Sequence, residues 1–397
     1  MKRYCKTADI YDLNAATGAV LRCLAKASTR KRRDTVRLFA RVGNMSEEEA
    51  ALLLRWRGKE YERLARLVAE ELLTAYRAGR LRLRTVRLKY MPDGSSGKIR
   101  AVAMVPVWQL MLDHIACAQL ADILRRVGFY QFSGLPGRGT VRGMQKLSKW
   151  LQNPAMKYIA QLDITKCYQS IDRGRLMAWL ASKVRNVTLL RFVGDLINTS
   201  PTPGLCLGSY LSQNLAALYL SELYHEITER MAKIRRSKRR GGAVRVNLVK
   251  HCIFYMDDIY LVGTSKKDLH AAVKLTRQKA AAMGLLIKST WRVLRVRESS
   301  GRGVVLDAMG FKISRDSVTV RRRVFRRARR TVLRITRRAA QGRLPALTQA
   351  RNLISYAGFF KHSNSGYFSH KYNLPAAVAA AKQTISNHDK KHASALQ

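Results

Sequence analysis

The sequence contains few acidic residues for its length. Its 397 residues include 26 Asp and Glu against 75 Lys and Arg, which gives a formal net charge of +49 at pH 7. A surface with that excess of one sign repels itself and requires a polyanionic partner, for which RNA or DNA is the first candidate. An acidic membrane surface is the weaker alternative, because no basic amphipathic helix stands apart as an anchor.

Long apolar runs and paired cysteines are missing as well. No run of 18 apolar residues occurs, and the opening residues, MKRYCKTADIYDL, contain no apolar stretch of the kind a signal peptide needs. The six cysteines lie far apart without a CxxC pair, which argues against a zinc ribbon and a disulfide framework. We therefore expect a cytoplasmic protein with reduced thiols.

The composition is otherwise that of a folded chain, and its first part carries helical patterns. Apolar residues make up 47% and charged residues 25%, which excludes a disordered protein. Ser46 followed by Glu49 is the signature of a capping box. Apolar residues then recur at helical spacing from Tyr61 to Ala75, and Gly79 follows as a helix stop. We expect a helical N-terminal extension and assign it no chemistry.

Two β-type runs follow this extension. RTVRLKYM and KIRAVAMV flank the turn sequence PDGSSG, which predicts a β-hairpin. The GxxGK within it lacks the GxxxxGK[ST] spacing of a phosphate-binding loop. Helical periodicity resumes over residues 108–124.

The pattern becomes mixed α/β from residue 157. Residues 158–164 are predicted to form a buried strand and residues 211–231 a long apolar helix. Two further strand runs, CIFYM and IYLVG, are separated only by two aspartates. Residues 321–338 hold 10 arginines in 18 positions, which predicts a helix with a cationic face. The last dozen residues are expected to form a frayed tail.

Three aspartates form the strongest candidate site. A separation of two residues between strand runs predicts a tight hairpin with Asp257 and Asp258 in its turn, and Asp163 ends an earlier strand. The alternatives are plain turn chemistry for the pair and a strand-end cap for Asp163. If that strand lies beside the hairpin in one sheet, the three carboxylates converge and repel one another. Two Mg²⁺ ions would relieve the repulsion and support nucleotidyl transfer to a primer 3′-hydroxyl.

Several motifs resemble those of reverse transcriptases, from about residue 85 to residue 375. FYMDDIYL resembles the YxDD box of that family, and LDITKCYQSI resembles its first palm motif. KIRAVAMVP is similar to the fingers motif, GLLIKSTWRV to the segment after the YxDD hairpin, and MGFKI to the primer grip. Where many members carry QGxxxSP, residues 207–213 are LGSYLSQ. That form, followed by NLAALYLSELYH, is similar to the reverse transcriptases of diversity-generating retroelements.

The resemblance implies a metal site and a nucleotide gate. Asp163, Asp257 and Asp258 would hold two Mg²⁺ ions, and the carbonyl group of Ile164 would complete one coordination shell. Tyr168 would be the steric gate that excludes a ribose 2′-hydroxyl and so selects dNTPs. A tyrosine that only packs in the core is the alternative for that position.

Three cations have implied roles in handling phosphates. Lys98 and Arg100 would clamp the triphosphate, and Arg100 is the better candidate because a guanidinium makes bidentate phosphate contacts. Lys288 would protonate the pyrophosphate leaving group. The alternatives are a solvated strand face for the first two and an exposed lysine near a turn for the third.

The LGxxxSQ box has implied consequences for fidelity. Leu207 stands where accurate relatives carry Gln, and a leucine side chain can neither donate nor accept a hydrogen bond near the incoming nucleotide. The resemblance therefore implies error-prone copying, chiefly opposite template adenines. Gly208 belongs to the same nucleotide-binding box, and Gln213 replaces the usual proline at the start of the helix. The alternative is that Leu207 and Gln213 only pack.

Two basic segments are candidates for gripping the template–primer backbone. An RNA–DNA duplex is held through its phosphates and its shape rather than through base edges. The candidate residues in these segments are Arg235, Arg236, Arg239, Arg240, Arg322, Arg326, Arg330 and Arg334. A solvated charged face is the alternative, although so many unpaired arginines on one helix would repel strongly.

The resemblance implies an α+β fold, a right-hand polymerase with fingers, a ferredoxin-like palm and a helical thumb, plus the N-terminal helical extension. The expected boundaries are 1–84 for the extension, 85–155 for the fingers, 156–178 and 204–315 for the palm, 179–203 for a fingers insertion, 316–380 for the thumb and 381–397 for a flexible tail.

The expected partners are a template RNA, a cDNA primer–template, dNTPs and an oligomeric accessory variability protein. One rival hypothesis is a reverse transcriptase of another group, such as a group II intron, retron or antiphage enzyme. The LGxxxSQ box argues against retrons, and no maturase or zinc endonuclease pattern follows residue 380. The other rival is a non-catalytic RNA-binding scaffold, against which the three aspartates argue.

Overall fold

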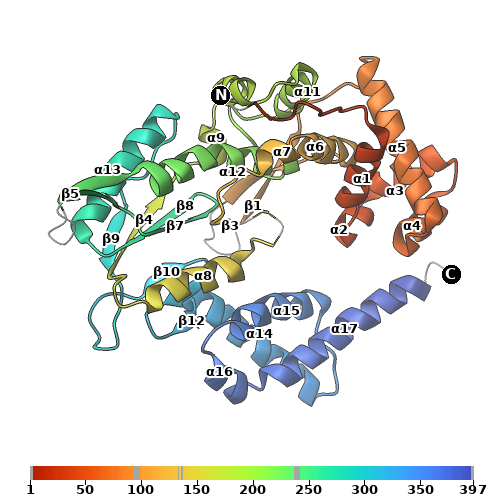
Figure 1. The fold of residues 1–397 in the computed structure, drawn as a ribbon. Helices are drawn as coiled ribbons and strands as arrows, with labels where there is room; N and C mark the ends of the chain where they lie inside the picture. The colour runs from red at the N-terminus through yellow and green to blue at the C-terminus, as the bar shows by residue number, and fades with distance from the viewer. Residues whose placement is uncertain (1–2, 93–98, 133, 136, 237–241, 395–397) are drawn as a thin grey trace. The chain divides into compact units, whose positions relative to one another are not determined.

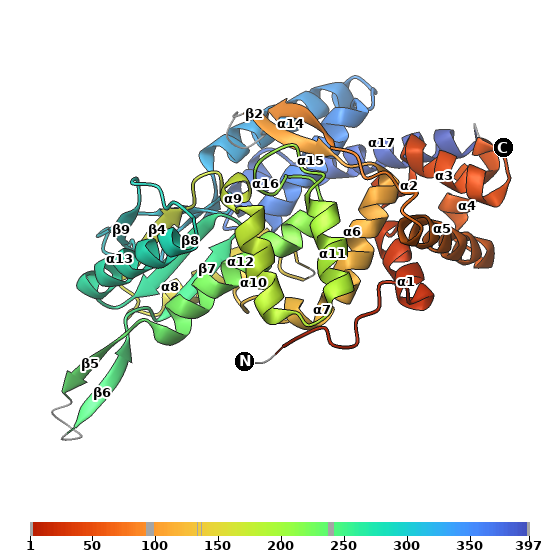
Figure 2. The ribbon, with the colours of Figure 1, turned by 90° about the horizontal axis from the view of Figure 1, so that it is seen from above.

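The computed structural model describes residues 3–92, 99–132, 134–135, 137–236 and 242–394. Three residues with predicted roles, Lys98, Arg239 and Arg240, lie outside the described residues, as does most of the turn predicted between the first two strands. The chain, drawn as a ribbon in Figures 1 and 2, divides into two units. The first unit comprises residues 1–129, 164–225 and 277–288, and the second comprises residues 130–163, 226–276 and 289–397.

Helices dominate the first unit. Its helices are α1 (Leu13–Cys23), α2 (Ala27–Arg30), α3 (Arg33–Gly43), α4 (Glu47–Trp56), α5 (Lys59–Arg77), α6 (Val107–Gln119), α7 (Ala121–Leu124), α9 (Cys167–Ser170), α10 (Arg173–Lys183), α11 (Val187–Ile197) and α12 (Tyr210–His225). The apolar helix α6 packs against α1, α11 and α12, so it carries the core of this unit. The predicted helices of the N-terminal extension and of residues 108–124 are confirmed.

The predicted capping box starts α4. The Ser46 hydroxyl accepts from the Glu49 N–H at 3.1 Å, while the Glu49 carboxylate accepts from the Ser46 N–H at 2.8 Å. The reciprocal bonds satisfy two amides that a helix start leaves without intrahelical partners. Helix α5 buries Tyr61, Leu64, Val68 and Leu72, which recur at the predicted helical spacing. It ends before Gly79, whose positive φ of 65° provides the expected stop.

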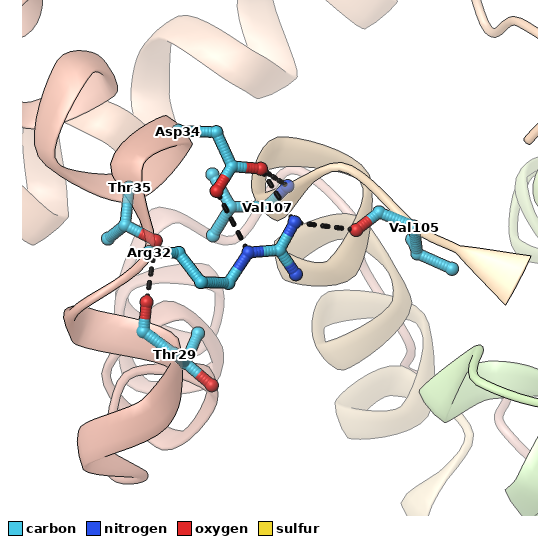
Figure 3. Close-up of polar contacts among 6 residues, drawn as sticks. All are labelled: Thr29, Arg32, Asp34, Thr35, Val105 and Val107. Carbon is cyan, nitrogen blue, oxygen red and sulfur yellow. Dashed lines mark hydrogen bonds and ion pairs between the residues drawn. The ribbon is translucent and has the colours of Figure 1, made fainter. Parts of the chain in front are cut away.

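A polar contact ties the N-terminal extension to the segment after β2 (Figure 3). Strands β1 (Arg87–Pro92) and β2 (Ile99–Met104) form the predicted antiparallel hairpin. Arg32 binds Asp34 through two hydrogen bonds and also donates to the Val105 carbonyl at 2.9 Å. Asp34 accepts from the Val107 N–H at 2.9 Å. Burial opposes ionisation, but the bonds from Arg32 and Val107 outweigh it and lower the pKa of Asp34.

A buried carboxylate anchors the start of α12. Asp113 on α6 is 2% exposed and accepts from the Ser209 hydroxyl at 2.7 Å and from the Leu211 N–H at 3.3 Å. The next residue, His114, stacks on Tyr210 with ring centroids 3.8 Å apart. Two neighbouring residues of α6 therefore hold the first turn of α12. The predicted helix over 211–231 ends at His225 and continues as the π-helical turn η1 (Glu226–Arg230) of the second unit.

The second unit is built on a five-stranded sheet with the strand order β3-β7-β8-β4-β9. Its strands are β3 (Gln131–Phe132), β4 (Tyr158–Asp163), β7 (His251–Tyr255), β8 (Asp258–Gly263) and β9 (Arg292–Arg295). One face carries Ile159, Ile253 and Val262, which form a single core with α8 (Thr140–Gln152) and the small sheet of β10 (Leu306–Ala308), β11 (Phe311–Ile313) and β12 (Val318–Val320). Helix α13 (Lys266–Ala282) follows β8, and its last residues belong to the first unit.

A buried arginine links the small sheet to α8. Arg315, in the β11–β12 connection, is 9% exposed and donates to the carbonyls of Leu151 at 3.0 Å and Asn153 at 2.6 Å. A third bond reaches the Met156 carbonyl at 3.4 Å. These carbonyls lie at and beyond the C-terminal end of α8, where intrahelical donors run out, so the guanidinium replaces them.

Two further substructures complete the second unit. Strands β5 (Ala232–Arg236) and β6 (Ala243–Asn247) pair as a ribbon that extends away from the five-stranded sheet (Figure 2). Helices α14 (Arg322–Ala340), α15 (Leu347–Lys361), α16 (Gly366–Lys371) and α17 (Leu374–Ser394) pack on an apolar core of their own. Residues from 381 onward, expected to form a tail, continue α17 as far as Ser394, because Ala377 and Ala381 anchor the helix in that core.

Among the residues that the structure describes, no helix combines the length and the apolar character needed to cross a membrane.

Arg315→Met is expected to lower the free energy of unfolding of the protein by about 3 kcal/mol, because it leaves three carbonyls without their charged donor. Urea denaturation monitored by circular dichroism measures this loss. Arg302→Met is the matched control, since Arg302 is an exposed arginine of the same unit and its loss should change stability by less than about 0.5 kcal/mol. Equal effects of the two substitutions would contradict the anchoring role.

Asp113→Asn is expected to change the pH dependence of stability. Burial raises the pKa of Asp113 to about 6, although bonds from Ser209 and Leu211 partly offset it, so the carboxylate destabilises the folded state as pH rises from about 4 to about 6. The amide cannot ionise. The stability difference between variant and wild type should therefore increase in favour of the variant by up to about 3 kcal/mol between pH 4 and pH 7. Urea midpoints measured across that range would contradict this assignment if the difference stayed constant.

Candidate active site

The turn of the YMDD hairpin lies one residue earlier than predicted. Tyr255 pairs with Asp258 across β7 and β8, so the two-residue turn consists of Met256 and Asp257. The prediction that both carboxylates lie in the turn is wrong for Asp258, which is the first residue of β8. Met256, the first residue of the turn, has a φ of 55°, and this left-handed conformation helps to reverse the chain.

The strand register brings two of the three carboxylates together. Asp163, the last residue of β4, lies directly opposite Asp258 in the antiparallel β4–β8 pair. Side chains of directly opposed residues project from the same face, with Cβ atoms about 4.5–5.5 Å apart. Asp163, Asp257 and Asp258 are each half-buried. The prediction that the first strand lies beside the hairpin in one sheet is therefore confirmed.

Two polar side chains, Tyr260 and Gln161, lie beside the two carboxylates on the same face of the sheet. The Tyr260 hydroxyl lies 3.4 Å from Asp258 Oδ2, and burial together with that carboxylate raises the pKa of Tyr260 well above its usual value. The phenol therefore stays protonated and can only donate to the carboxylate. Gln161, two residues before Asp163, donates to the Asp307 carbonyl at 3.1 Å. The carboxylate face is thereby connected to β10.

The donor chemistry of this face suits a hard divalent cation. Carboxylate oxygens are the ligands that Mg²⁺ prefers, and two like charges opposite each other gain from a bound cation. Among the described residues, however, no three His, Cys, Asp or Glu side chains are grouped as a metal site requires. The structure thus establishes the opposed pair of carboxylates, and the metal-binding role of the three aspartates stays a prediction.

Several predicted nucleotide-binding residues meet in the first unit. The Tyr168 carbonyl accepts from the Leu205 N–H at 2.9 Å, and the Leu207 carbonyl accepts from the Ala103 N–H of β2 at 2.6 Å. Gly208 has a φ of 106°, and a Cβ atom there would lie 2.5 Å from the Ala103 carbonyl oxygen. Only glycine fits this close approach. The LGxxxSQ box is therefore fixed against the strand that carries Arg100, which is exposed.

The remaining predicted residues of this unit lie on neighbouring segments. Ile164 forms an antiparallel bridge with Ile287, the residue before Lys288, and both isoleucines are buried. Lys288 is half-buried. Gln213 is also half-buried and lies in the first turn of α12, which Asp113 anchors. The role of each of these residues stays a prediction.

The arginine-rich helix α14 borders a cationic cavity in the second unit. The cavity has a volume of about 680 Å³. It is lined by Asp307, Lys312, Arg321, Arg322, Arg323, Arg326, Arg327 and Arg330. Asp307, the one acid among the described residues of the lining, pairs with Arg321 at 2.6 Å and with Lys312 at 3.1 Å. The excess of arginine therefore leaves the cavity strongly positive, as a phosphate site requires.

Sequence reasoning found part of this surface. Arg322, Arg326 and Arg330 line the cavity as a helical face, whereas Arg334 is exposed outside its lining. Lys312 was missed because it lies on β11, and it joins the arginines through Asp307, which also pairs with Arg321, the residue before α14. The other missed cations are Arg321, Arg323 and Arg327, which belong to the same arginine run. The high density of arginine in that run is the feature of the sequence that could have identified them.

The basic segment that contains Arg235 and Arg236 forms a β-ribbon as far as it is described. Arg235 and Arg236 lie on β5 and are exposed. The base of the ribbon is held by an ion pair between Lys233 and Asp268 and by Arg245, which donates to the Glu229 carbonyl at 2.5 Å. The ribbon therefore presents arginines on a fixed base.

The comparisons with known proteins agree with this geometry. The family model described as reverse transcriptase (RNA-dependent DNA polymerase) matches residues 91–291, just over half of the chain. The matched segment contains the three aspartates, the LGxxxSQ box and Lys288, and it ends before α14. No curated protein gives a significant match. The mixed helices and strands suit the α+β class expected from the sequence, and the family implies a template RNA and nucleotide substrates. The chain therefore belongs to the reverse transcriptase family and is an RNA-directed DNA polymerase.

Proposed function

We propose that this reverse transcriptase copies a template-repeat RNA into adenine-mutagenised cDNA for the targeted diversification of a gene, as a component of a diversity-generating retroelement. The observation that supports the catalytic part is the register that sets Asp163 opposite Asp258, with Asp257 in the adjoining turn. The observation that supports the retroelement part is the LGxxxSQ box, whose leucine replaces a hydrogen-bonding residue.

In this proposal the three carboxylates hold two Mg²⁺ ions, with the Ile164 carbonyl completing one shell. When bound, the ions would lower the pKa of the primer 3′-hydroxyl and stabilise the charge on the transferring phosphate. The chain contributes a rigid support, because Asp163 and Asp258 end or begin paired strands and Tyr260 donates to Asp258. Rigid placement keeps both carboxylates on one face before any ligand binds.

Residues of the first unit would orient the nucleotide. Arg100 binds the triphosphate, the Tyr168 ring excludes a 2′-hydroxyl, and Lys288 donates a proton to the pyrophosphate. The backbone bonds of Tyr168 and Leu207 support this proposal, because they join Tyr168 to Leu205, just before the LGxxxSQ box, and join the box itself to β2. A half-buried Leu207 side chain offers the nucleotide only an apolar surface, so incorrect pairs are rejected less strongly.

We assign the proposed subdomains to the boundaries expected from the sequence. Residues 85–155 and 179–203 would be the fingers, residues 156–178 and 204–315 the palm, and residues 316–380 the thumb. The arginines of α14 and of the β5–β6 ribbon would hold the phosphates of the template–primer duplex. An oligomeric accessory variability protein would be the partner, with a structured RNA as template.

Asp257→Ala is expected to reduce primer extension on an RNA template by at least about a thousandfold, because it removes one of three carboxylates that would stabilise the transition state. RNA affinity should change little, since the phosphate-binding arginines lie elsewhere in the chain. Asp316→Ala, an exposed turn aspartate of the same unit, is the control and should retain activity. Loss of RNA binding together with activity would indicate misfolding or a wrong assignment.

Leu207→Gln is expected to lower misincorporation opposite template adenine, because the amide restores a hydrogen-bonding group beside the nucleotide. Sequencing of cDNA made from a defined RNA, with and without the accessory protein, measures the error spectrum. Leu286→Gln provides the control, since Leu286 is an exposed leucine of the same unit. An unchanged spectrum in the Leu207 variant would remove this role from the residue.

Arg326→Ala is expected to weaken RNA binding and to make its salt dependence shallower by about 0.7 in the log–log slope, as the loss of one phosphate contact predicts. The wild type should show a steep decrease of affinity with salt. Arg329→Ala is the control on the same helix, since Arg329 donates to the Tyr372 hydroxyl at 2.9 Å and does not line the cavity. Identical slopes for all three proteins would contradict the phosphate-binding role of the cavity.

A further inference from the structure

A second cavity lies within the first unit, and none of its lining residues is assigned to catalysis or nucleotide binding above. Its volume is about 560 Å³, within the range of about 300–1,000 Å³ that is usual for ligand sites. It is formed where the end of α5 meets α11, the segment before α1 and the residues that follow Gly79. The lining groups that bear on its chemistry are Tyr11, Tyr76, Arg77, Arg191, Asp195 and Asn198.

One wall carries an ordered hydrogen-bond acceptor. The Tyr76 hydroxyl donates to Asp195 Oδ2 at 2.7 Å, and both residues are half-buried. Burial and the neighbouring Asp195 carboxylate raise the pKa of Tyr76. The phenol therefore stays protonated and donates its hydrogen bond to Asp195 Oδ2. The other carboxylate oxygen accepts no bond from the residues described by the structure, and it is available to a ligand hydroxyl.

Other residues of the cavity lining are aromatic or cationic. The Arg77 guanidinium carbon lies over the Tyr11 ring, 3.9 Å from its centroid, and both residues line the cavity. Arg191 and Asp195 are four residues apart on α11 and so share one side of that helix. Arg191 is exposed and Asn198 caps the end of the helix. The cavity therefore offers a stacking platform, a cation and a carboxylate acceptor.

These groups match the parts of a single ribonucleotide. Bases stack on aromatic rings and on guanidinium planes, phosphates pair with arginine, and a carboxylate accepts from ribose hydroxyls. A purely apolar ligand would leave the two arginines and the aspartate without compensation. An acidic peptide would use the arginines but would be repelled by Asp195. RNA is already a substrate of this enzyme family, and the net charge of +49 attracts it.

We propose that this cavity binds one unpaired ribonucleotide of an RNA strand. Its base would stack against the Arg77–Tyr11 pair, its ribose hydroxyl would donate to Asp195, and its phosphate would pair with Arg191. The site would select RNA over DNA through the ribose hydroxyl. This proposal rests on membership of the reverse transcriptase family and is independent of the retroelement assignment.

Photocrosslinking of the full chain tests the proposal. A single-stranded oligouridine with one 4-thiouridine is irradiated with the protein and digested with trypsin. We expect crosslinks in the peptides 7–22 and 67–77, which contain Tyr11 and Tyr76. Arg191→Ala and Asp195→Asn should each reduce those crosslinks about tenfold, while Arg185→Ala, an exposed arginine just before α11, should leave them unchanged.

Competition identifies the ligand class. Unlabelled RNA should displace the crosslinked strand at least about tenfold better than DNA of the same sequence, and Asp195→Asn should abolish most of that preference. Crosslinks confined to other peptides would overturn the site, and equal competition by DNA would overturn recognition of the ribose. Competition by oligoglutamate as strong as that by RNA would instead assign the cavity to an acidic protein. If Arg185→Ala lost the crosslinks as strongly as Arg191→Ala, RNA would bind here by general electrostatic attraction, and the proposed site would be wrong.

Discussion

Asp163 lies opposite Asp258 because β4 and β8 pair in a single register, and the candidate active site depends on that pairing. Two like charges directly opposite each other destabilise an antiparallel pair by themselves. The apolar side chains of Ile159, Val262 and their neighbours hold the strands together against this repulsion. A slip of one residue would turn Asp163 to the opposite face, where it would replace an apolar side chain. The buried face of the sheet therefore keeps the carboxylates in position.

The LGxxxSQ box is held in place by contacts that leave the side chain of Leu207 unused. The loop is fixed by the Leu207 carbonyl, by the absence of a side chain at Gly208 and by the buried Asp113 at the start of α12. None of these contacts uses the Leu207 side chain. A change of that side chain can therefore leave the backbone in place, and in the proposed function this allows the residue to alter fidelity without loss of the fold.

The arginines of α14 form a strongly positive surface. On α14, Val332 and Ile335 pack in the core, so the arginines are confined to the other sides of the helix, where several of them line one cavity. Asp307, the one acid among the described residues that line that cavity, is paired with Arg321 and Lys312 and does not neutralise the rest. Repulsion among the arginines opposes the fold in isolation, and nucleic acid phosphates would relieve it.

The sequence by itself determined the elements whose causes are local. The capping box at Ser46, the strand before Asp163, the YMDD hairpin and the arginine helix all follow from periodicity and turn chemistry. Tertiary structure alone decided the register that opposes Asp163 and Asp258 and the pairing of Asp307 with both Lys312 and Arg321. These features arise from contacts between distant segments, and local pattern carries no information about which residues of two strands become partners. The cavity between α5 and α11 was invisible for the same reason, because its walls meet only in the folded chain.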